Sequence, residues 1–185
     1  AQKSSIYNSN LKEYETAVSL FNAGQFGNAK LVFDRLNSSA LHPELQSDLM
    51  YYTAICAIRE RQPNAGVLME RFINNYPTST SKKNTSYLEI GHFYFQQENY
   101  EKALAWYNQV DEMYLAVSES EKYNFQKGYS FFITKNKKEA TTYFNKVVES
   151  ENYGSQAKYY LGFMAYEGDD YKQATKYFDA VSNEG

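Results

Sequence analysis

Few residues of this chain could support catalysis or bind a metal ion. Its 185 residues include one cysteine, Cys56, and two histidines, His42 and His92. One thiolate and two imidazoles cannot complete a structural zinc cage, and a single cysteine cannot form an internal disulfide. We expect Cys56 to be a small buried apolar residue. We expect His42, which precedes Pro43, in a solvated loop, and His92 as a hydrogen-bonding residue rather than a ligand or a base.

Common catalytic motifs are also missing from the sequence. It contains no glycine-rich phosphate loop, no Gly-x-Ser-x-Gly elbow and no His-Glu-x-x-His pair. The usual routes to phosphoryl transfer, acyl transfer and metal-dependent hydrolysis therefore lack their residues. The acidic pair Asp169 and Asp170 fits a helix start, where the macrodipole favours negative charge. We predict a protein that is not an enzyme and that uses no cofactor or metal.

Charge and hydropathy exclude two further classes of function. The chain carries 19 Lys and Arg against 22 Asp and Glu, a net charge of −3. It therefore has no basic field for nucleic-acid binding, and the lysines at 135–138 are expected at a solvated turn. No apolar stretch is long enough to cross a bilayer. The unusual feature is an aromatic content of 17%, mostly tyrosine, a residue suited to half-buried surfaces.

The elements that position these rings follow from an internal repeat. Five alanines, 36, 38, 37 and 34 residues apart, are each followed four residues later by a large apolar residue: Ala29, Ala65, Ala103, Ala140 and Ala174. Twelve residues before each Ala stands another small residue: Ala17, Thr53, Gly91, Gly128 and Gly162. Small residues at fixed points let two antiparallel helices approach closely. Each repeat is therefore predicted to be a helical hairpin.

Helix-start signals support these boundaries. Ser118 with Glu121 three residues later predicts a capping box before the first helix of the fourth repeat, and Asn136 with Glu139 predicts one before its second helix.

The third repeat carries the clearest motif. It reads Tyr87-x2-Ile90-Gly91-x2-Tyr94, then Tyr100-x2-Ala103-x3-Tyr107. This pattern resembles the tetratricopeptide repeat (TPR). The resemblance implies an all-α, right-handed superhelical solenoid of about five hairpins, at residues 10–44, 45–80, 81–117, 118–153 and 154–185, after a lead-in at residues 1–9. The amino-acid sequence of several segments, such as Tyr100-Glu101-Lys102-Ala103, also resembles the N-terminal part of large cell-envelope TPR proteins of Bacteroidetes bacteria.

That narrower resemblance implies a periplasmic or cell-envelope location, with a cytoplasmic one left open. Because no polar capping helix follows the fifth repeat, we also expect the natural protein to continue past Gly185.

In the TPR family the first helices of the hairpins line an inner groove. Three positions per helix face it, and in the last three repeats these are Leu88, His92, Phe95, Phe125, Tyr129, Phe132, Tyr159, Phe163 and Tyr166. Seven of the nine are Phe or Tyr, and a large apolar patch commonly marks a contact surface. The rings could equally pack against the next repeat.

The predicted function is a protein–protein interaction scaffold that binds a peptide or helix of an unidentified partner in this groove. Grooves of the family that bind acidic chaperone tails use Lys and Asn where this chain has rings, so such tails are not expected here. The alternative is self-association or stacking within a larger repeat protein.

Overall fold

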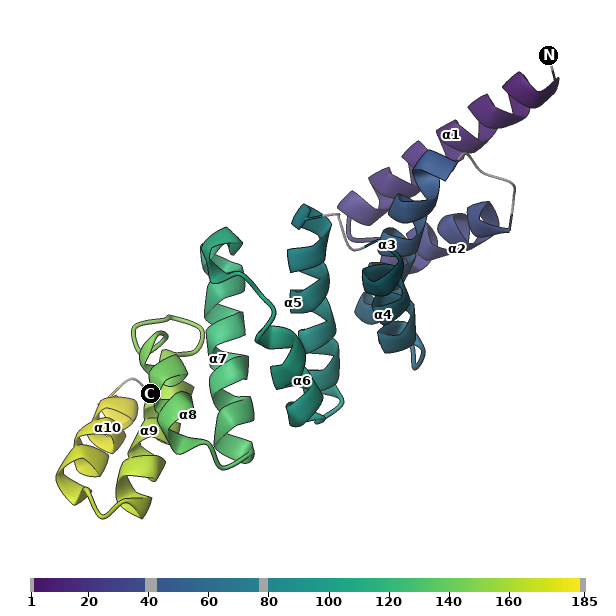
Figure 1. Cartoon of the computed structure of the whole chain (residues 1–185). Coiled ribbons are helices and arrows are strands. Elements are labelled where there is room, and N and C mark those ends of the chain that lie inside the picture. Colours follow the sequence, from purple (N-terminus) through teal and green to yellow (C-terminus); the bar gives the residue numbers. More distant parts are fainter. Residues whose placement is uncertain (1, 39–42, 77–79, 184–185) are drawn as a thin grey trace. The chain divides into compact units, whose positions relative to one another are not determined.

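The computed structural model describes residues 2–38, 43–76 and 80–183, and every regular element in these ranges is a helix (Figure 1). This confirms the predicted all-α class. The helices are α1 (Gln2–Asn22), α2 (Phe26–Asn37), α3 (Pro43–Arg59), α4 (Ala65–Asn75), α5 (Thr80–Gln96), α6 (Tyr100–Tyr107), the 3₁₀ turn η1 (Glu112–Tyr114), α7 (Val117–Ile133), α8 (Lys137–Asn145), α9 (Gly154–Glu167) and α10 (Tyr171–Asn183).

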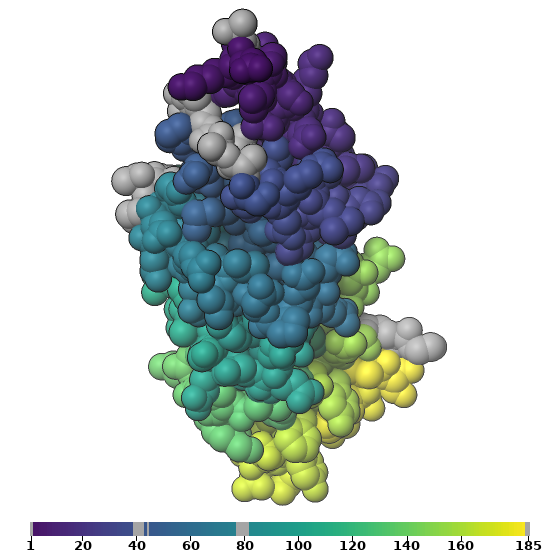
Figure 2. All heavy atoms as spheres, turned by 90° about the vertical axis from the view of Figure 1, so that its right-hand side faces the viewer, coloured from purple at the N-terminus to yellow at the C-terminus, as the bar shows by residue number. Residues whose placement is uncertain are grey.

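Consecutive helices pair as hairpins. Contacts join α1 to α2, α3 to α4, α7 to α8 and α9 to α10. In the space-filling view the atoms of α9 and α10 form one continuous yellow-green and yellow body (Figure 2). The chain forms two compact units, Ala1–Phe93 and Tyr94–Gly185, which we call the N-terminal and C-terminal units. Residues 2–9, assigned above to a lead-in, form the first part of α1.

Each first helix ends in the same kind of turn. One residue per turn has a positive φ: Gly24, Arg61, Glu98, Lys135 and Asp169. In the fourth turn the N–H of Lys135 donates to the carbonyl of Phe132 (3.2 Å), and the N–H of Asn136 donates to that of Phe131 (2.8 Å). These bonds satisfy the last carbonyls of the helix, as in a Schellman motif. Four of the five residues are not glycine, so these turns hold side chains in a disfavoured backbone region.

Small residues set the helix spacing in the last two hairpins, as the repeat predicted. A Cβ atom placed on Gly128 of α7 would lie 3.1 Å from the ring of Phe144 on α8. A Cβ on Gly162 of α9 would lie 2.8 Å from the ring of Phe178 on α10. The repeat alanine of the fourth hairpin, Ala140, is fully buried. The close approach fixes which faces of α7 and α9 turn away from their partner helices.

The helix starts differ in part from the prediction. Helix α7 begins at Val117, and the N–H of Ala116 donates to the carboxylate of Glu119 (3.1 Å). The capping box predicted at Ser118 and Glu121 is therefore wrong. The helix starts earlier, and it is the carboxylate of Glu119 that reaches back to the N–H of the residue before the helix. Asn136 does precede α8, but its amide donates to the hydroxyl of Thr134 (3.0 Å) and caps no helical N–H.

Each unit has its own core. In the N-terminal unit one core cluster consists of Ala17, Ala29, Phe33, Leu36, Leu49 and Cys56. Cys56 is fully buried, as predicted, and burial raises its pKa to about 12. In the C-terminal unit a core cluster consists of Phe125, Ala140, Phe144, Val147, Ala157, Leu161 and Met164. His42 lies outside the described residues.

Polar contacts join the first helices within the N-terminal unit. The guanidinium of Arg59 on α3 donates to both carboxylate oxygens of Glu89 on α5, at 3.1 and 2.5 Å. The same guanidinium lies 5.3 Å from the ring centre of Phe26. Asp48 on α3 accepts from the hydroxyl of Tyr14 on α1 (3.1 Å) and pairs with Lys82 of α5. These contacts connect α1, α3 and α5.

Candidate functional site

The nine predicted groove residues lie in different units. Leu88 and His92 are on α5 in the N-terminal unit, and both are buried. The other seven belong to the C-terminal unit, where α5, α7 and α9 carry Phe95, Phe125, Tyr129, Phe132, Tyr159, Phe163 and Tyr166. The surface described below is therefore built from the C-terminal unit alone.

Tyr129 of α7 is the central ring of this surface. Its ring centre lies 5.8 Å from that of Phe95, 5.6 Å from Tyr100 and 5.4 Å from Tyr160. All three pairs are edge-to-face, a geometry that adds about 0.5–1.5 kcal/mol per pair to the effect of burial. The rings thus connect the end of α5 and the start of α6 to α7 and α9.

A second set of contacts extends the rings along α7 and α9. Phe132 lies 5.1 Å from Tyr160 and 5.9 Å from Phe163. Tyr159 lies 5.4 Å from Tyr160. We call these eight rings the aromatic surface: Phe95, Tyr100, Phe125, Tyr129, Phe132, Tyr159, Tyr160 and Phe163. Tyr166 is exposed at the far end of α9, where its ring centre lies 5.4 Å from that of Tyr171, the first residue of α10.

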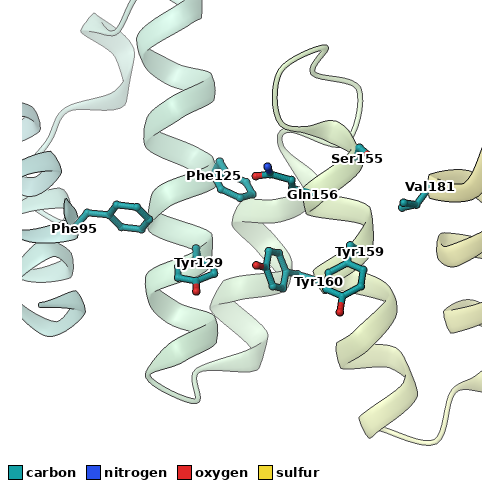
Figure 3. Close-up of a pocket in the computed structure, with 8 residues that line it drawn as sticks. All are labelled: Phe95, Phe125, Tyr129, Ser155, Gln156, Tyr159, Tyr160 and Val181. Carbon is teal, nitrogen blue, oxygen red and sulfur yellow. The ribbon is translucent and has the colours of Figure 1, made fainter. Parts of the chain in front are cut away.

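A pocket of about 500 Å³ opens within the aromatic surface (Figure 3). Its walls come from the end of α5, one face of α7, the first turns of α9 and the end of α10. The residues that line it are Phe95, Phe125, Tyr129, Ser155, Gln156, Tyr159, Tyr160 and Val181. We call it the aromatic pocket. Five of its eight residues are aromatic and none is charged.

The rings differ in how far they are buried. Phe125 is only 8% exposed, because Tyr153 stacks on it at 5.1 Å and Phe144 lies at 5.8 Å. Tyr159 is 51% exposed, and Phe163 is also exposed. The same stripe therefore contains core residues on α7 and solvent-facing residues on α9. Packing accounts for the burial of Phe125, and binding at Tyr159 and Phe163 stays a prediction.

The phenols of Tyr100 and Tyr160 are neutral hydrogen-bonding groups at physiological pH. Burial raises the pKa of Tyr100 and that of Tyr160, and the neighbouring phenol of Tyr129 adds to both shifts. Polar groups of the pocket also include the hydroxyl of Ser155 and the amide of Gln156. The site combines ring faces with uncharged donors and acceptors, a composition typical of ligand-binding pockets.

Sequence reasoning missed several residues of the aromatic pocket and of the aromatic surface around it. Tyr160 lies next to a predicted groove residue but inserts its ring between Tyr129 and Phe144, at 5.4 and 5.5 Å. Tyr100 was assigned to the repeat pattern alone, although its ring contacts both Phe95 and Tyr129. Val181 comes from α10, the second helix of the last hairpin, and the family pattern places only first helices in the groove. For Tyr160, the only sequence signal was the unbroken aromatic pair at 159–160.

A buried polar cluster lies elsewhere in the C-terminal unit. Lys127 of α7 is 5% exposed, and its ammonium donates to the hydroxyl of Tyr123 (2.8 Å) and lies 4.5 Å from the ring centre of Tyr143. The Tyr123 hydroxyl donates to the carboxylate of Glu112 (3.1 Å), which also pairs with Lys146 (3.3 Å). Burial lowers the pKa of Lys127 to about 8; Glu112 opposes this shift and Lys146 adds to it. We call these five residues the lysine cluster.

In the described part of the chain, no group of three or more His, Cys, Asp or Glu side chains is placed to hold a metal ion. No helix in the same ranges is long and apolar enough to span a membrane.

Stacked antiparallel hairpins with small residues at fixed phase define a helical-repeat protein. Tetratricopeptide repeat models match residues 48–79, 85–116 and 121–152. These matches lie within predicted repeats two, three and four and cover just over half of the chain. The chain belongs to the tetratricopeptide repeat family, and the fold and family together support a protein–protein interaction scaffold.

Solved structures of MamA proteins share the fold. A MamA point mutant is 15% identical and aligns with a TM-score of 0.77 over 95% of this chain and 96% of that chain. MamA AMB-1 is 14% identical, with a TM-score of 0.76 over 95% and 91%. MamA from residue 41 to its end, from Desulfovibrio magneticus RS-1, is 15% identical, with a TM-score of 0.68 over 94% and 93%. No curated protein matches the sequence.

Proposed function

We propose that this chain is a non-catalytic scaffold whose aromatic surface binds an extended or helical segment of a partner protein. The observation that carries the proposal is the aromatic pocket, which combines five rings with uncharged polar groups. Rings supply large contact areas with little loss of side-chain entropy, and Tyr is enriched among residues that dominate binding energy. The exposed rings of Tyr159 and Phe163 continue the surface beyond the pocket.

Packing alone does not account for this surface. Tyr129 and Tyr160 each contact several other rings, so part of their surface has a structural role. Tyr159, by contrast, keeps half of its surface in solvent while lining the pocket. An exposed ring beside a concave apolar wall is where a partner side chain gains most by excluding water.

A peptide selection tests the proposal. Linear peptides from a random display library are selected on the immobilised chain, and the dissociation constants of enriched peptides are measured in solution. We expect Tyr159→Ala to weaken binding by about 1–3 kcal/mol, with far-UV circular dichroism unchanged. Tyr159 is a cleaner probe than Tyr129, whose removal would also disturb packing between α7 and α9.

Tyr114→Ala is the matched control. Tyr114 lies in η1, is 75% exposed and is not part of the aromatic surface. Its removal is expected to leave peptide affinity unchanged. Enriched peptides that bind Tyr159→Ala as tightly as the wild type would mean that they bind elsewhere, and the proposal would be wrong.

Self-association, the alternative function, stays a prediction, and so does the cell-envelope location. Sedimentation over a concentration series tests the first of these: a monomer at every concentration would exclude self-association of this chain.

A further inference from the structure

We infer that the segment bound by the aromatic surface is basic, and that an arginine side chain of the partner enters the aromatic pocket. This inference rests on the proposed function and specifies the chemistry of the partner. Three observations support it: the ring faces of the pocket, two unpaired carboxylates beside it, and the net charge of the C-terminal unit.

The ring faces of the aromatic pocket can bind a cation. The face of an aromatic ring attracts a cation, and arginine is the most frequent protein cation in such contacts. The unit has its own cation–π pairs, formed by Lys102 with Tyr94, by Lys127 with Tyr123 and Tyr143, and by Lys146 with Tyr143. Among the described residues, none of these pairs uses a ring of the aromatic pocket. No described cation of the chain therefore occupies the pocket rings, and Tyr159, which is 51% exposed, offers its ring to a cation from a partner.

Two carboxylates lie beside the same rings. A second hollow of about 500 Å³ is lined by Glu98, Asn99, Tyr100, Glu101, Ile133 and Thr134. Tyr100 connects it to the aromatic pocket, because its ring contacts Phe95 at 5.5 Å and Tyr129 at 5.6 Å. The charge of Glu98 contributes to the raised pKa of Tyr100, which places this carboxylate within electrostatic reach of the phenol.

Glu98 and Glu101 are exposed, and neither has an ion-pair partner within the described ranges. Elsewhere in the C-terminal unit, carboxylates such as Glu112 and Glu167 do pair with lysines. Two unpaired carboxylates in one hollow favour a cationic guest and repel an acidic one.

The charge of the whole unit acts in the same direction. Residues 94–185 carry fourteen Asp and Glu against ten Lys and no Arg, a net charge of −4. Such a field attracts basic segments and slows the approach of acidic ones. A planar guanidinium can stack on a ring while its N–H groups bond to neighbouring acceptors, which a compact ammonium does less well. Acceptors at the pocket are the phenols of Tyr129 and Tyr160 and the side chains of Ser155 and Gln156.

Three defined peptides test the inference. Each is a fluorescein-labelled glycine–serine peptide with two phenylalanines and three variable positions, which are all Arg, all Gln or all Glu. Dissociation constants are measured by fluorescence polarisation against the intact chain at low and at moderate salt. We expect the Arg peptide to bind at least about ten-fold more tightly than the Gln peptide, the Glu peptide to bind most weakly, and the Arg preference to shrink as salt rises.

Variants locate the effect. The double variant Glu98→Gln/Glu101→Gln is expected to weaken the Arg peptide by about three- to ten-fold and to leave the Gln peptide unchanged. The control Glu139→Gln/Asp179→Asn removes the same charge from exposed positions that line neither hollow. It is expected to leave the Arg preference intact. Tyr159→Ala is expected to weaken both the Arg and Gln peptides, and the Arg peptide more, because it also loses a ring face for its guanidinium.

The outcomes separate this inference from the proposed function. Equal binding of the Arg and Gln peptides, with both lost in Tyr159→Ala, would overturn the basic partner and support the aromatic binding surface. Preferred binding of the Glu peptide, or an equal loss of Arg preference in the control variant, would also overturn it. Failure of all three peptides to bind would contradict both the inference and the proposed function.

Discussion

Replacement of Lys127 by methionine is expected to stabilise the C-terminal unit. Lys127 is 5% exposed, and desolvation of its ammonium lowers its pKa from 10.5 to about 8. Each tenfold change in proton affinity corresponds to about 1.4 kcal/mol, so the charged lysine costs at most ~3 kcal/mol of stability. Methionine has a similar length and no charge. Glu112 keeps Lys146 and Tyr123 as partners in the variant, so no charge is left buried and unpaired.

We therefore expect Lys127→Met to raise the free energy of unfolding by about 1–3 kcal/mol at pH 7. The folded pKa of Lys127 lies below the unfolded one, so between about pH 8 and pH 10 the unfolded chain binds more protons. Over that interval the wild type gains stability relative to the variant, and the advantage of the variant disappears by about pH 10. Burial also raises the pKa of Cys56, and this lowers the stability of both proteins above about pH 9. The quantity to compare is therefore the difference in unfolding free energy between the wild type and Lys127→Met.

Urea unfolding from pH 7 to pH 10 provides the measurement. It can be followed by circular dichroism and by the fluorescence of Trp106, the single tryptophan, which lies in the same unit. Lys122→Met, which removes a lysine from the same helix outside the lysine cluster, is the control and is expected to change stability little. A destabilised Lys127→Met at pH 7, or a difference that does not shrink towards pH 10, would refute the assignment of a desolvation cost to this lysine.

Two further predictions concern the backbone and the helix spacing. Lys135→Gly is expected to stabilise the chain by about 1 kcal/mol in urea unfolding, because Lys135 has a φ of 68° that glycine adopts without strain; a loss of stability would contradict this. Gly162→Ala is expected to destabilise it by about 1–2 kcal/mol, since the new methyl group would lie 2.8 Å from Phe178 and the gain in helix propensity offsets only part of that clash. The control Gly168→Ala, whose new methyl group meets nothing closer than 3.5 Å, is expected to be neutral or slightly stabilising.

The hairpins could be predicted because their signal is local and repeated. Gly128 and Phe144 are small and large partners at fixed spacing, and the structure brings them into contact. The phase of one repeat therefore predicted the others. The start of α7 could not be placed as well, because Glu119 and Glu121 can both reach back to an N–H, and the connection through η1 decides which one does so.

The division of the rings between core and surface was beyond the sequence. Phe125 is buried because Tyr153, from the connection after α8, stacks on it. Tyr159 stays exposed although it occupies the matching position on α9. The difference arises from neighbours on other helices and connections, which the pattern of one helix does not contain. The same holds for Lys127, whose burial depends on Tyr143 of the following helix.

Chemical-shift mapping of the chain is the most direct test that the Arg peptide binds at the aromatic surface. The chain is labelled with ¹⁵N, its backbone amides are assigned, and the Arg peptide is titrated in. We expect the largest chemical-shift changes of backbone amides at 95–101, from the end of α5 to the start of α6, at 125–133 on α7 and at 155–163 on α9. Changes confined to the N-terminal unit, or spread over the exposed face of α8, would contradict binding at the aromatic surface.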